Sequence, residues 1–491
     1  MSLIWVFYHG EVDIAYWEYV LGFVYLLIIF IYFAREKNIK LKGAPEYRHF
    51  IWGLFAKLFG GVAFSLIYFY YYAGGDTIMY FYSAVSLSKM AAVDPGMYLD
   101  VVTGPNSMEN LSKFNDTIGY PFAYVYFDPR TYFLIRVISP LVYITFNSYL
   151  LTTLILASIS YIGIWRCYRT FVSYFPSLMN KFAVAFLYMP SVVFWGSGIM
   201  KDTLTFSATC WYIHSLDEVF FKRRNFVMGM AGLVVSSAIM IIMKPYIFMA
   251  VFPVSVLWLL YSRVAAIRSS LIRFVLLPTA VVAMFGMSMY VLTTLGDRLD
   301  KFSLQSALTT IQTTQADMIR AEQYGNNFFD IGTIDGTWTG LISKFPIATN
   351  AALFRPYIWE ARSVVVLLSA LENSWLMGFI LLLLWRTRVR FFFRCLMGNP
   401  LVLVCFIFAV LFGFTIGVST PNFGALVRFK IPLVPFFVAG LYIISFLNEL
   451  RRRTEHAGYR FDLREYRSGE PKALPRGAAT AGSTAKGRSS S

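Results

Sequence analysis

The sequence predicts an all-α protein that crosses a membrane about eleven times. Its 491 residues are 57% hydrophobic and only 14% charged, whereas soluble domains are roughly 45–50% apolar and about 25% charged. The apolar residues come as separate runs of about 20, the length that a helix needs to cross about 30 Å of hydrocarbon. Basic residues gather after every second run, which is typical of a multi-pass membrane protein.

The predicted spans end where apolar residues give way to charged or turn-forming residues. They cover residues 15–34, 51–72, 149–166, 181–195, 203–221, 226–243, 247–262, 272–293, 366–385, 399–417 and 430–447.

The basic clusters predict the orientation of the chain. Clusters such as Lys222-Arg223-Arg224 and Arg451-Arg452-Arg453 follow the first, third, fifth, seventh, ninth and last spans. They share one side if the N-terminus lies outside and the C-terminus lies in the cytoplasm of a bacterium, with the spans in its inner membrane. This pattern explains the net charge of +16 without a nucleic-acid partner.

Residues 131–146 (TYFLIRVISPLVYITF) decide whether this orientation holds. If they spanned the membrane, every later basic cluster would move to the outside. The run is short and contains Arg136 and Pro140, which favours a helix that lies at the outer interface. A true span with an unusual topology remains the alternative.

The spans divide the chain into six predicted segments. A two-helix segment (1–72) precedes a first outer loop with interfacial helices (73–148), a transmembrane bundle (149–293), a second large outer loop (294–365), a C-terminal bundle (366–450) and a disordered basic cytoplasmic tail (451–491). A helix is predicted at 300–323 inside the second loop. The four cysteines lack CxxC spacing, so we expect neither a disulfide framework nor a zinc cluster. No cleavable signal is evident, because acidic residues precede the first apolar run.

Two predicted outer turns carry acids. Gly74-Gly75-Asp76 ends the second span, and partial burial would raise the pKa of a carboxylate there toward that of a general base. Lys201-Asp202 forms a second, very short turn, where an acid at a helix start is favoured by the helix dipole. The alternatives are that Asp76 and Asp202 only cap their helices and that Lys201 is solvated.

Further charged residues are predicted near the outer face. Lys244, before Pro245 and Tyr246, is either a snorkelling anchor or an anion ligand. Glu372 interrupts an apolar run, where an ionisable group is costly unless it faces a cavity or a partner. The remaining candidates, which break the positive-inside pattern or lie beside such residues, are Arg355, Glu360, Asn422, Arg428 and Lys430.

Together these residues predict a site for a phosphate group at one membrane surface. Lys201, Lys244, Arg355, Arg428 and Lys430 would form a cationic set suited to phosphate or pyrophosphate, while a carboxylate takes the proton of an acceptor. No Walker loop, GxSxG, HExxH or GxGxxG motif is present, which leaves no sign of a nucleotide, hydrolase or zinc-protease site.

This layout resembles the GT-C superfamily of membrane glycosyltransferases, which use polyprenyl-phosphate-linked sugars. The resemblance covers roughly residues 50–270 and rests on three features. They are the acid at Asp76 that opens a long outer loop, Lys201-Asp202 after the Met189-Pro190 span, and the interfacial helix 131–146. It implies Asp76 as the base or an acid near a divalent metal (Mg or Mn), with Asp202 as the second acid.

The chain departs from that family in having a lone acid at Asp76 and an extra preceding span. Its C-terminal half is similar to proteins of bacterial surface-polysaccharide clusters, including O-antigen polymerases. We therefore expect transfer of a sugar from a polyprenyl-phosphate donor to a glycan, lipid or protein acceptor. The alternatives are an oligosaccharide-repeat polymerase, a transporter or flippase of a lipid-linked substrate, and a non-enzymatic subunit of an envelope complex.

Overall fold

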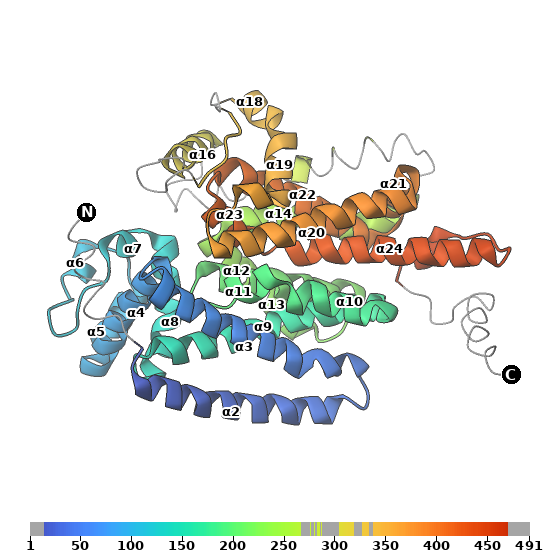
Figure 1. The fold of residues 1–491 in the computed structure, drawn as a ribbon. Helices are drawn as coiled ribbons and strands as arrows, with labels where there is room; N and C mark the ends of the chain where they lie inside the picture. Colours follow the sequence, from blue (N-terminus) through green and yellow to red (C-terminus); the bar gives the residue numbers. More distant parts are fainter. Residues whose placement is uncertain are drawn as a thin grey trace. The chain divides into compact units, whose positions relative to one another are not determined.

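The computed structural model describes residues 14–266, 304–318, 327–332 and 337–469, together with a few isolated positions between 275 and 286. Within these ranges every regular element is a helix, and the only strand-like pairing is an isolated bridge between Phe328 and Asn422. The predicted all-α class is therefore confirmed (Figure 1).

Seven helices in the described part of the chain are long and apolar enough to cross a membrane, which supports a multi-pass membrane protein. Each coincides with one of the predicted spans. They are Tyr16–Lys40, Pro45–Tyr71, Tyr149–Tyr174, Phe226–Met243, Val364–Thr387, Pro400–Ser419 and Val434–His456.

The predicted count of eleven spans is not confirmed. The predicted span 181–195 is divided into α10 (Met179–Ala183), the π-helical η4 (Val184–Tyr188) and α11 (Pro190–Trp195), because Pro190 lacks the amide hydrogen that a continuous helix needs. The predicted span 247–262 lies in α14 (Pro245–Ala266), whose described apolar part is too short for a candidate span.

The two other predicted spans are likewise not among the seven candidate spans. Residues 203–221 form α12 (Lys201–Leu216) and η5 (Asp217–Phe221), helices that carry several buried threonines and serines. Residues 272–293 lie almost entirely outside the described residues.

Contacts divide the chain into two compact units, and the six predicted topological segments stay a prediction. Unit 1 comprises residues 1–167 and 187–248, and unit 2 comprises residues 168–186 and 249–491.

In unit 1, α2 (Tyr16–Lys40) and α3 (Phe50–Leu66, between η1 at Pro45–His49 and η2 at Ile67–Tyr71) pack beside α9 (Tyr149–Tyr174). The Tyr161 hydroxyl donates to the Phe50 carbonyl at 2.7 Å, and the Trp165 ring packs against the rings of Tyr47 and Phe50. The apolar face that α2 leaves exposed is the surface that a lipid-facing helix presents.

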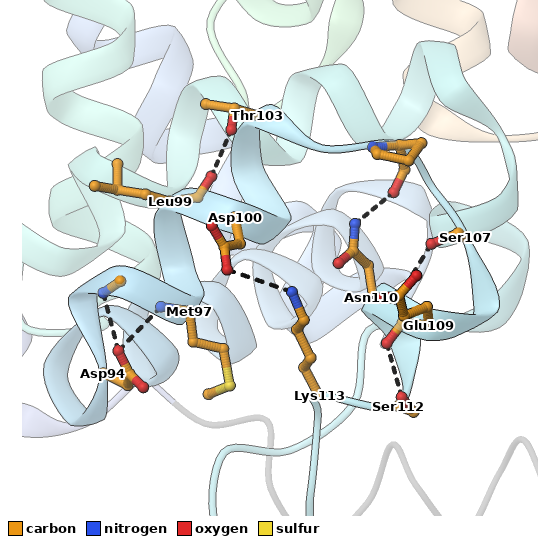
Figure 2. Close-up of polar contacts among 12 residues, drawn as sticks. Asp94, Met97, Leu99, Asp100, Thr103, Ser107, Glu109, Asn110, Ser112 and Lys113 are labelled. Carbon is orange, nitrogen blue, oxygen red and sulfur yellow. Dashed lines mark hydrogen bonds and ion pairs between the residues drawn. The ribbon is translucent and has the colours of Figure 1, made fainter.

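Residues 73–148, the predicted first outer loop, contain a small helical subdomain at one end of unit 1 (left in Figure 1). Asp94 caps α5 by accepting hydrogen bonds from the amides of Gly96 and Met97, and Lys113 lies 3.5 Å from Asp100 (Figure 2). The helices of this subdomain are α4 (Asp76–Val93), α5 (Pro95–Thr103), α6 (Met108–Leu111), α7 (Ala123–Phe127) and α8 (Pro129–Ile144).

The ambiguous run 131–146 forms α8, a 16-residue helix that is not among the seven candidate spans. The Arg136 guanidinium donates to the Asn106 side chain at 2.8 Å and to the carbonyls of Val101 and Gly104. These acceptors belong to the loop subdomain, so Arg136 binds α8 to that subdomain. Arg136 is also the charged residue that argued against a membrane span at 131–146. Its place at the membrane interface stays a prediction.

In unit 2, α22 (Pro400–Ser419) packs against α19 (Phe345–Phe354) and α24 (Val434–His456). A Cβ atom on Gly417 would overlap the Ala348 carbonyl, so glycine is needed for the close approach of α19. The other described elements are η3 (Pro176–Leu178), α16 (Leu304–Met318), α18 (Trp338–Ser343), η6 (Ile358–Glu360), α20 (Val364–Thr387), α21 (Val389–Gly398), α23 (Phe423–Phe429) and η7 (Leu463–Tyr466).

One expectation for unit 2 agrees with the structure and another changes. The predicted helix 300–323 contains α16, and the rest of that range lies outside the described residues. The tail predicted as disordered from 451 is folded up to residue 469, because α24 continues to His456 and the Asn399 amide donates to the Tyr466 carbonyl at 2.7 Å. Residues 470–491 are outside the described residues.

Candidate functional site

A cluster of charged and polar side chains forms in unit 1, where α8 and α12 begin and where α13 (Phe226–Met243) meets α14. Helix α13 packs against both α8 and α12, which brings together three segments that are distant in sequence. The members of this unit 1 cluster are Asp128, Arg130, Thr131, Lys201, Asp202, Lys244 and Tyr246.

The most buried part of the cluster is an ion pair between Lys244 and Asp202. Only 2% of Asp202 and 4% of Lys244 are exposed, and the Lys244 ammonium also lies 5.9 Å from the centre of the Tyr246 ring. The sequence predicted Lys244 as an anchor or an anion ligand, but its ammonium is engaged by a carboxylate from the same unit. A buried charge needs such a partner, because either charge alone would be costly.

Lys201, the neighbour of Asp202, points to α8 instead. Its ammonium donates to the Thr131 hydroxyl at 2.8 Å and lies 3.7 Å from the Asp128 carboxylate. The side chain remains 22% exposed, so among the lysines of the cluster it is the more accessible to a ligand.

Asp128 holds the start of α8. Its carboxylate accepts hydrogen bonds from the Arg130 amide at 3.2 Å and from the Thr131 hydroxyl. Burial acts to raise the pKa of Asp128, but the Thr131 hydrogen bond, the Lys201 charge and the backbone amide outweigh it and lower that pKa overall. The carboxylate is therefore ionised at neutral pH.

Arg130 completes the cluster, because its guanidinium interacts electrostatically with Asp128 and Tyr246. Burial lowers the pKa of Arg130, but arginine remains protonated in proteins. Three cations against two carboxylates leave the cluster with one positive charge, which suits an anionic ligand.

The turn between α11 and α12, residues 196–200, is anchored by a lysine inside a span. Lys57 of α3 is 3% exposed and donates a hydrogen bond to the Gly196 carbonyl. A Cβ atom on Gly60 would overlap the Val193 carbonyl, and one on Gly198 would overlap the Phe64 ring. Glycine therefore allows the turn to lie directly against α3.

These contacts also place the turn along the length of α3. Lys57 lies 14 residues before Tyr71, the last residue of that continuous helical segment. At 1.5 Å per residue, it lies about 21 Å from that end of the segment, and Phe64, against which Gly198 packs, lies about 10 Å from it. The turn therefore packs within the length of a candidate span, between Lys57 and Phe64.

Asp76 lies at the start of α4, a helix that packs against α8. Gly75 precedes it with a φ of +110°, a conformation that favours glycine, and Thr77 next to it bonds the Tyr149 hydroxyl at 2.7 Å. The Asp76 side chain is partly exposed. It therefore remains accessible to a substrate, unlike Asp202.

The candidate residues of unit 2 form a second group. Arg355 and Glu360 make a bidentate ion pair with Nε–O distances of 3.0 and 3.1 Å. The guanidinium also lies 4.8, 5.7 and 5.5 Å from the ring centres of Phe329, Tyr357 and Phe423. We call these five residues the Arg355 clamp. Glu360 accepts hydrogen bonds from the Nε and Nη2 atoms of Arg355, and the predicted phosphate contact of Arg355 stays a prediction.

Lys430 lies beside the clamp, after α23. Only 1% of it is exposed, and its ammonium donates to the Asn373 side chain and, at 3.3 Å, to the Arg355 carbonyl. Burial lowers the pKa of Lys430, and the Glu372 charge opposes this effect. Glu372 therefore has the partner charge that its place in an apolar run requires.

Asn422 and Arg428 belong to α23 and its cap. The Asn422 side chain accepts a hydrogen bond from the Ala425 amide at 3.1 Å, and its backbone pairs with Phe328 of the second outer loop. The Arg428 guanidinium lies 5.0 Å from the Phe429 ring centre. Asn422 thus has a structural role at a helix start.

The predicted cationic set is therefore distributed over both units. Lys201 and Lys244 belong to unit 1, whereas Arg355, Arg428 and Lys430 belong to unit 2. That the two groups serve a common site stays a prediction.

The sequence reasoning missed Asp128, Arg130 and Lys57. Asp128-Pro129 is an ordinary signature of a helix start, which conceals any further role. Lys57 carried a clearer signal, because it is a charge inside a run that otherwise reads as a span.

No three His, Cys, Asp or Glu side chains in the described ranges converge as a metal site would require. A divalent ion near Asp76 and Asp202, as the family resemblance implies, stays a prediction.

Comparisons with known proteins give no relative: no protein-family model, no curated protein and no solved structure matches this chain.

Proposed function

We propose that this protein is an integral-membrane glycosyltransferase. It would transfer a sugar from a polyprenyl-phosphate donor to a glycan, lipid or protein acceptor at the outer face of a bacterial inner membrane. The observation that carries this proposal is the unit 1 cluster, in which cations and carboxylates from three distant segments meet with one positive charge in excess.

In this proposal the accessible cation Lys201 and its neighbour Arg130 bind the phosphate of the lipid carrier. The Lys244–Asp202 pair holds the start of α12 in place, and so positions Lys201. Cations that contact a departing phosphate stabilise the charge that develops on it. This assignment replaces Arg355 as a phosphate ligand, because Glu360 already occupies its guanidinium.

Asp76 supplies the base. The acceptor hydroxyl oxygen forms a bond to the anomeric carbon of the sugar as the bond between that carbon and the phosphate oxygen breaks. The Asp76 carboxylate takes the hydroxyl proton, and the electron pair of the broken bond leaves with the phosphate. Positioned carboxylates contribute about 10²- to 10⁴-fold as general bases.

The test uses purified full-length protein in proteoliposomes with a polyprenyl-phosphate sugar and a pool of acceptors. Asp76→Asn is expected to lower transfer at least 100-fold while the protein remains folded. Asp116→Asn, on the same predicted outer loop and exposed, is the matched control and should keep wild-type transfer. Full activity of Asp76→Asn would refute the assignment of the base.

A second candidate is a transporter or flippase for the same class of lipid-linked substrate. It is favoured by the packing of the 196–200 turn, with buried Lys57, within the length of a candidate span. Interrupted helices with charges at mid-membrane depth are typical of transporters. Movement of the lipid-linked sugar across proteoliposomes by the pure protein, without a chemical product, would support this candidate over the glycosyltransferase.

A further inference from the structure

Helix α21 joins two candidate spans and has two distinct faces. Phe391, Phe392 and Cys395 are buried in unit 2, whereas Arg390, Phe393 and Arg394 are exposed. Residues three and four apart lie on the same face of a helix, so the two arginines and the exposed phenylalanine form one continuous surface.

The buried face of α21 is fixed by the end of the chain. The Arg451 guanidinium of α24 lies 4.0 Å from the centre of the Phe391 ring. The centres of the Phe391 and Phe461 rings are 6.2 Å apart. The Asn399 amide, directly after α21, bonds the Tyr466 carbonyl. The segment that follows α24 thus packs back against α21 and holds its exposed face in a defined orientation.

The exposed side chains at this end of unit 2 are mostly cationic, with aromatic rings between them. Trp385 at the end of α20 is 79% exposed and Phe393 is 55% exposed. Glu449 is paired with Arg453, and the other exposed carboxylates at this end, Glu455, Asp462 and Glu465, belong to the end of α24 and the segment after it. The exposed arginines on α21 and in the residues just before it, which form what we call the α21 surface, are Arg386, Arg388, Arg390 and Arg394.

We propose that the α21 surface binds the headgroups of anionic phospholipids in the leaflet where α20, α22 and α24 end. The charge is complementary, and these three candidate spans end or begin at α21, which places the surface at a bilayer boundary. Exposed Trp and Phe side chains favour the same interfacial depth. This binding is independent of the proposed transferase activity, since it uses none of the residues of the unit 1 cluster.

The test is a lipid titration of the full-length protein in neutral detergent, read by native mass spectrometry. Phosphatidylglycerol and phosphatidylcholine are the two probes. Each arginine near an anionic surface contributes about fivefold in affinity, so Arg390→Gln/Arg394→Gln should weaken phosphatidylglycerol binding by about 25-fold. Binding of phosphatidylcholine should not change. If the double variant does not fold, Arg390→Gln alone should give about a fivefold loss.

The matched control is Arg223→Gln/Arg224→Gln, which removes two exposed arginines from the turn between η5 and α13. It lowers the net charge equally but should leave the tight phosphatidylglycerol sites intact. An equal loss in both double variants would show that the total charge alone matters, and would overturn the proposal. Unchanged phosphatidylglycerol binding by the α21 variants would overturn it as well.

Discussion

The two groups of charged residues differ in how far apart their partners lie in the sequence. In the unit 1 cluster, Lys244 and Asp202 are 42 residues apart, and Lys201 and Thr131 are 70 apart. In the Arg355 clamp, the ion pair joins Arg355 and Glu360, which are five residues apart, whereas the distant residues Phe329 and Phe423 contribute ring contacts. An ion pair between near neighbours rigidifies one loop, whereas pairs between distant helices hold several segments around one place. The comparison assigns a structural role to the clamp and a binding role to the cluster.

The largest effect is expected from breaking the buried pair of unit 1. Asp202→Asn leaves the Lys244 charge buried without its carboxylate, so the free energy of unfolding should fall by about 3–5 kcal/mol. Reversible unfolding of the purified protein in detergent measures this. The double variant Asp202→Asn/Lys244→Met should be more stable than Asp202→Asn. Additive losses would mean that the two residues are not coupled.

The next effect concerns the clamp. Arg355→Ala removes a bidentate ion pair and the contacts with three rings, so the free energy of unfolding should fall by roughly 2–3 kcal/mol. Arg355→Lys should lose most of the same unfolding free energy, because an ammonium group cannot replace the planar fork of a guanidinium. Donor affinity of the folded protein should not change. A loss of donor affinity without a loss of stability would return Arg355 to the phosphate site.

Lys201→Gln should show the opposite pattern. Because the side chain is partly exposed, the free energy of unfolding should change by less than about 1 kcal/mol. The KM for the lipid-linked donor should rise about 10-fold, as one charge-assisted contact to phosphate is lost. Steady-state transfer kinetics measure this, and Lys113→Gln on the outer loop is the control. An unchanged KM would exclude Lys201 as a phosphate ligand.

The smallest effect is a pH dependence at Asp128. Because the folded-state pKa of Asp128 is lowered, its contribution to stability is present above the unfolded pKa and is lost as the pH falls through the folded value. Asp128→Asn should therefore be less stable than wild type at pH 6, by less than about 1 kcal/mol. The difference should shrink near pH 3. Unfolding at both pH values tests this, and a constant difference would exclude the linkage.

Particular residues show how far the sequence could predict the site. Lys201, Asp202 and Lys244 could be selected because they are charged residues in short turns between predicted spans. Their mutual pairing could not be predicted, since it depends on how α8, α12 and α13 pack. Arg355 was assigned to phosphate because the sequence does not reveal that the Glu360 carboxylate reaches its guanidinium.

In the fold, too, some features could be predicted from the sequence and others could not. The seven candidate spans were predicted from composition and length alone, because crossing hydrocarbon demands a long apolar helix. Of the predicted spans that are not among the seven, 181–195 contains Pro190, and 203–221 contains several buried hydroxyl side chains. Their final conformation depends on contacts with α3 and α13, and such contacts have no local signal.

Lys57 has a consequence for the synthesis of the chain. Its acceptor, the Gly196 carbonyl, lies 139 residues further along the sequence. At about 5–20 residues per second, the ribosome needs roughly 7–28 s to make that interval. During this time the second span enters the membrane with an ammonium group whose acceptor does not yet exist. The apolar residues of this span must therefore offset the cost of one lysine, about 2.5–3.5 kcal/mol, until the turn at Gly196 has been made.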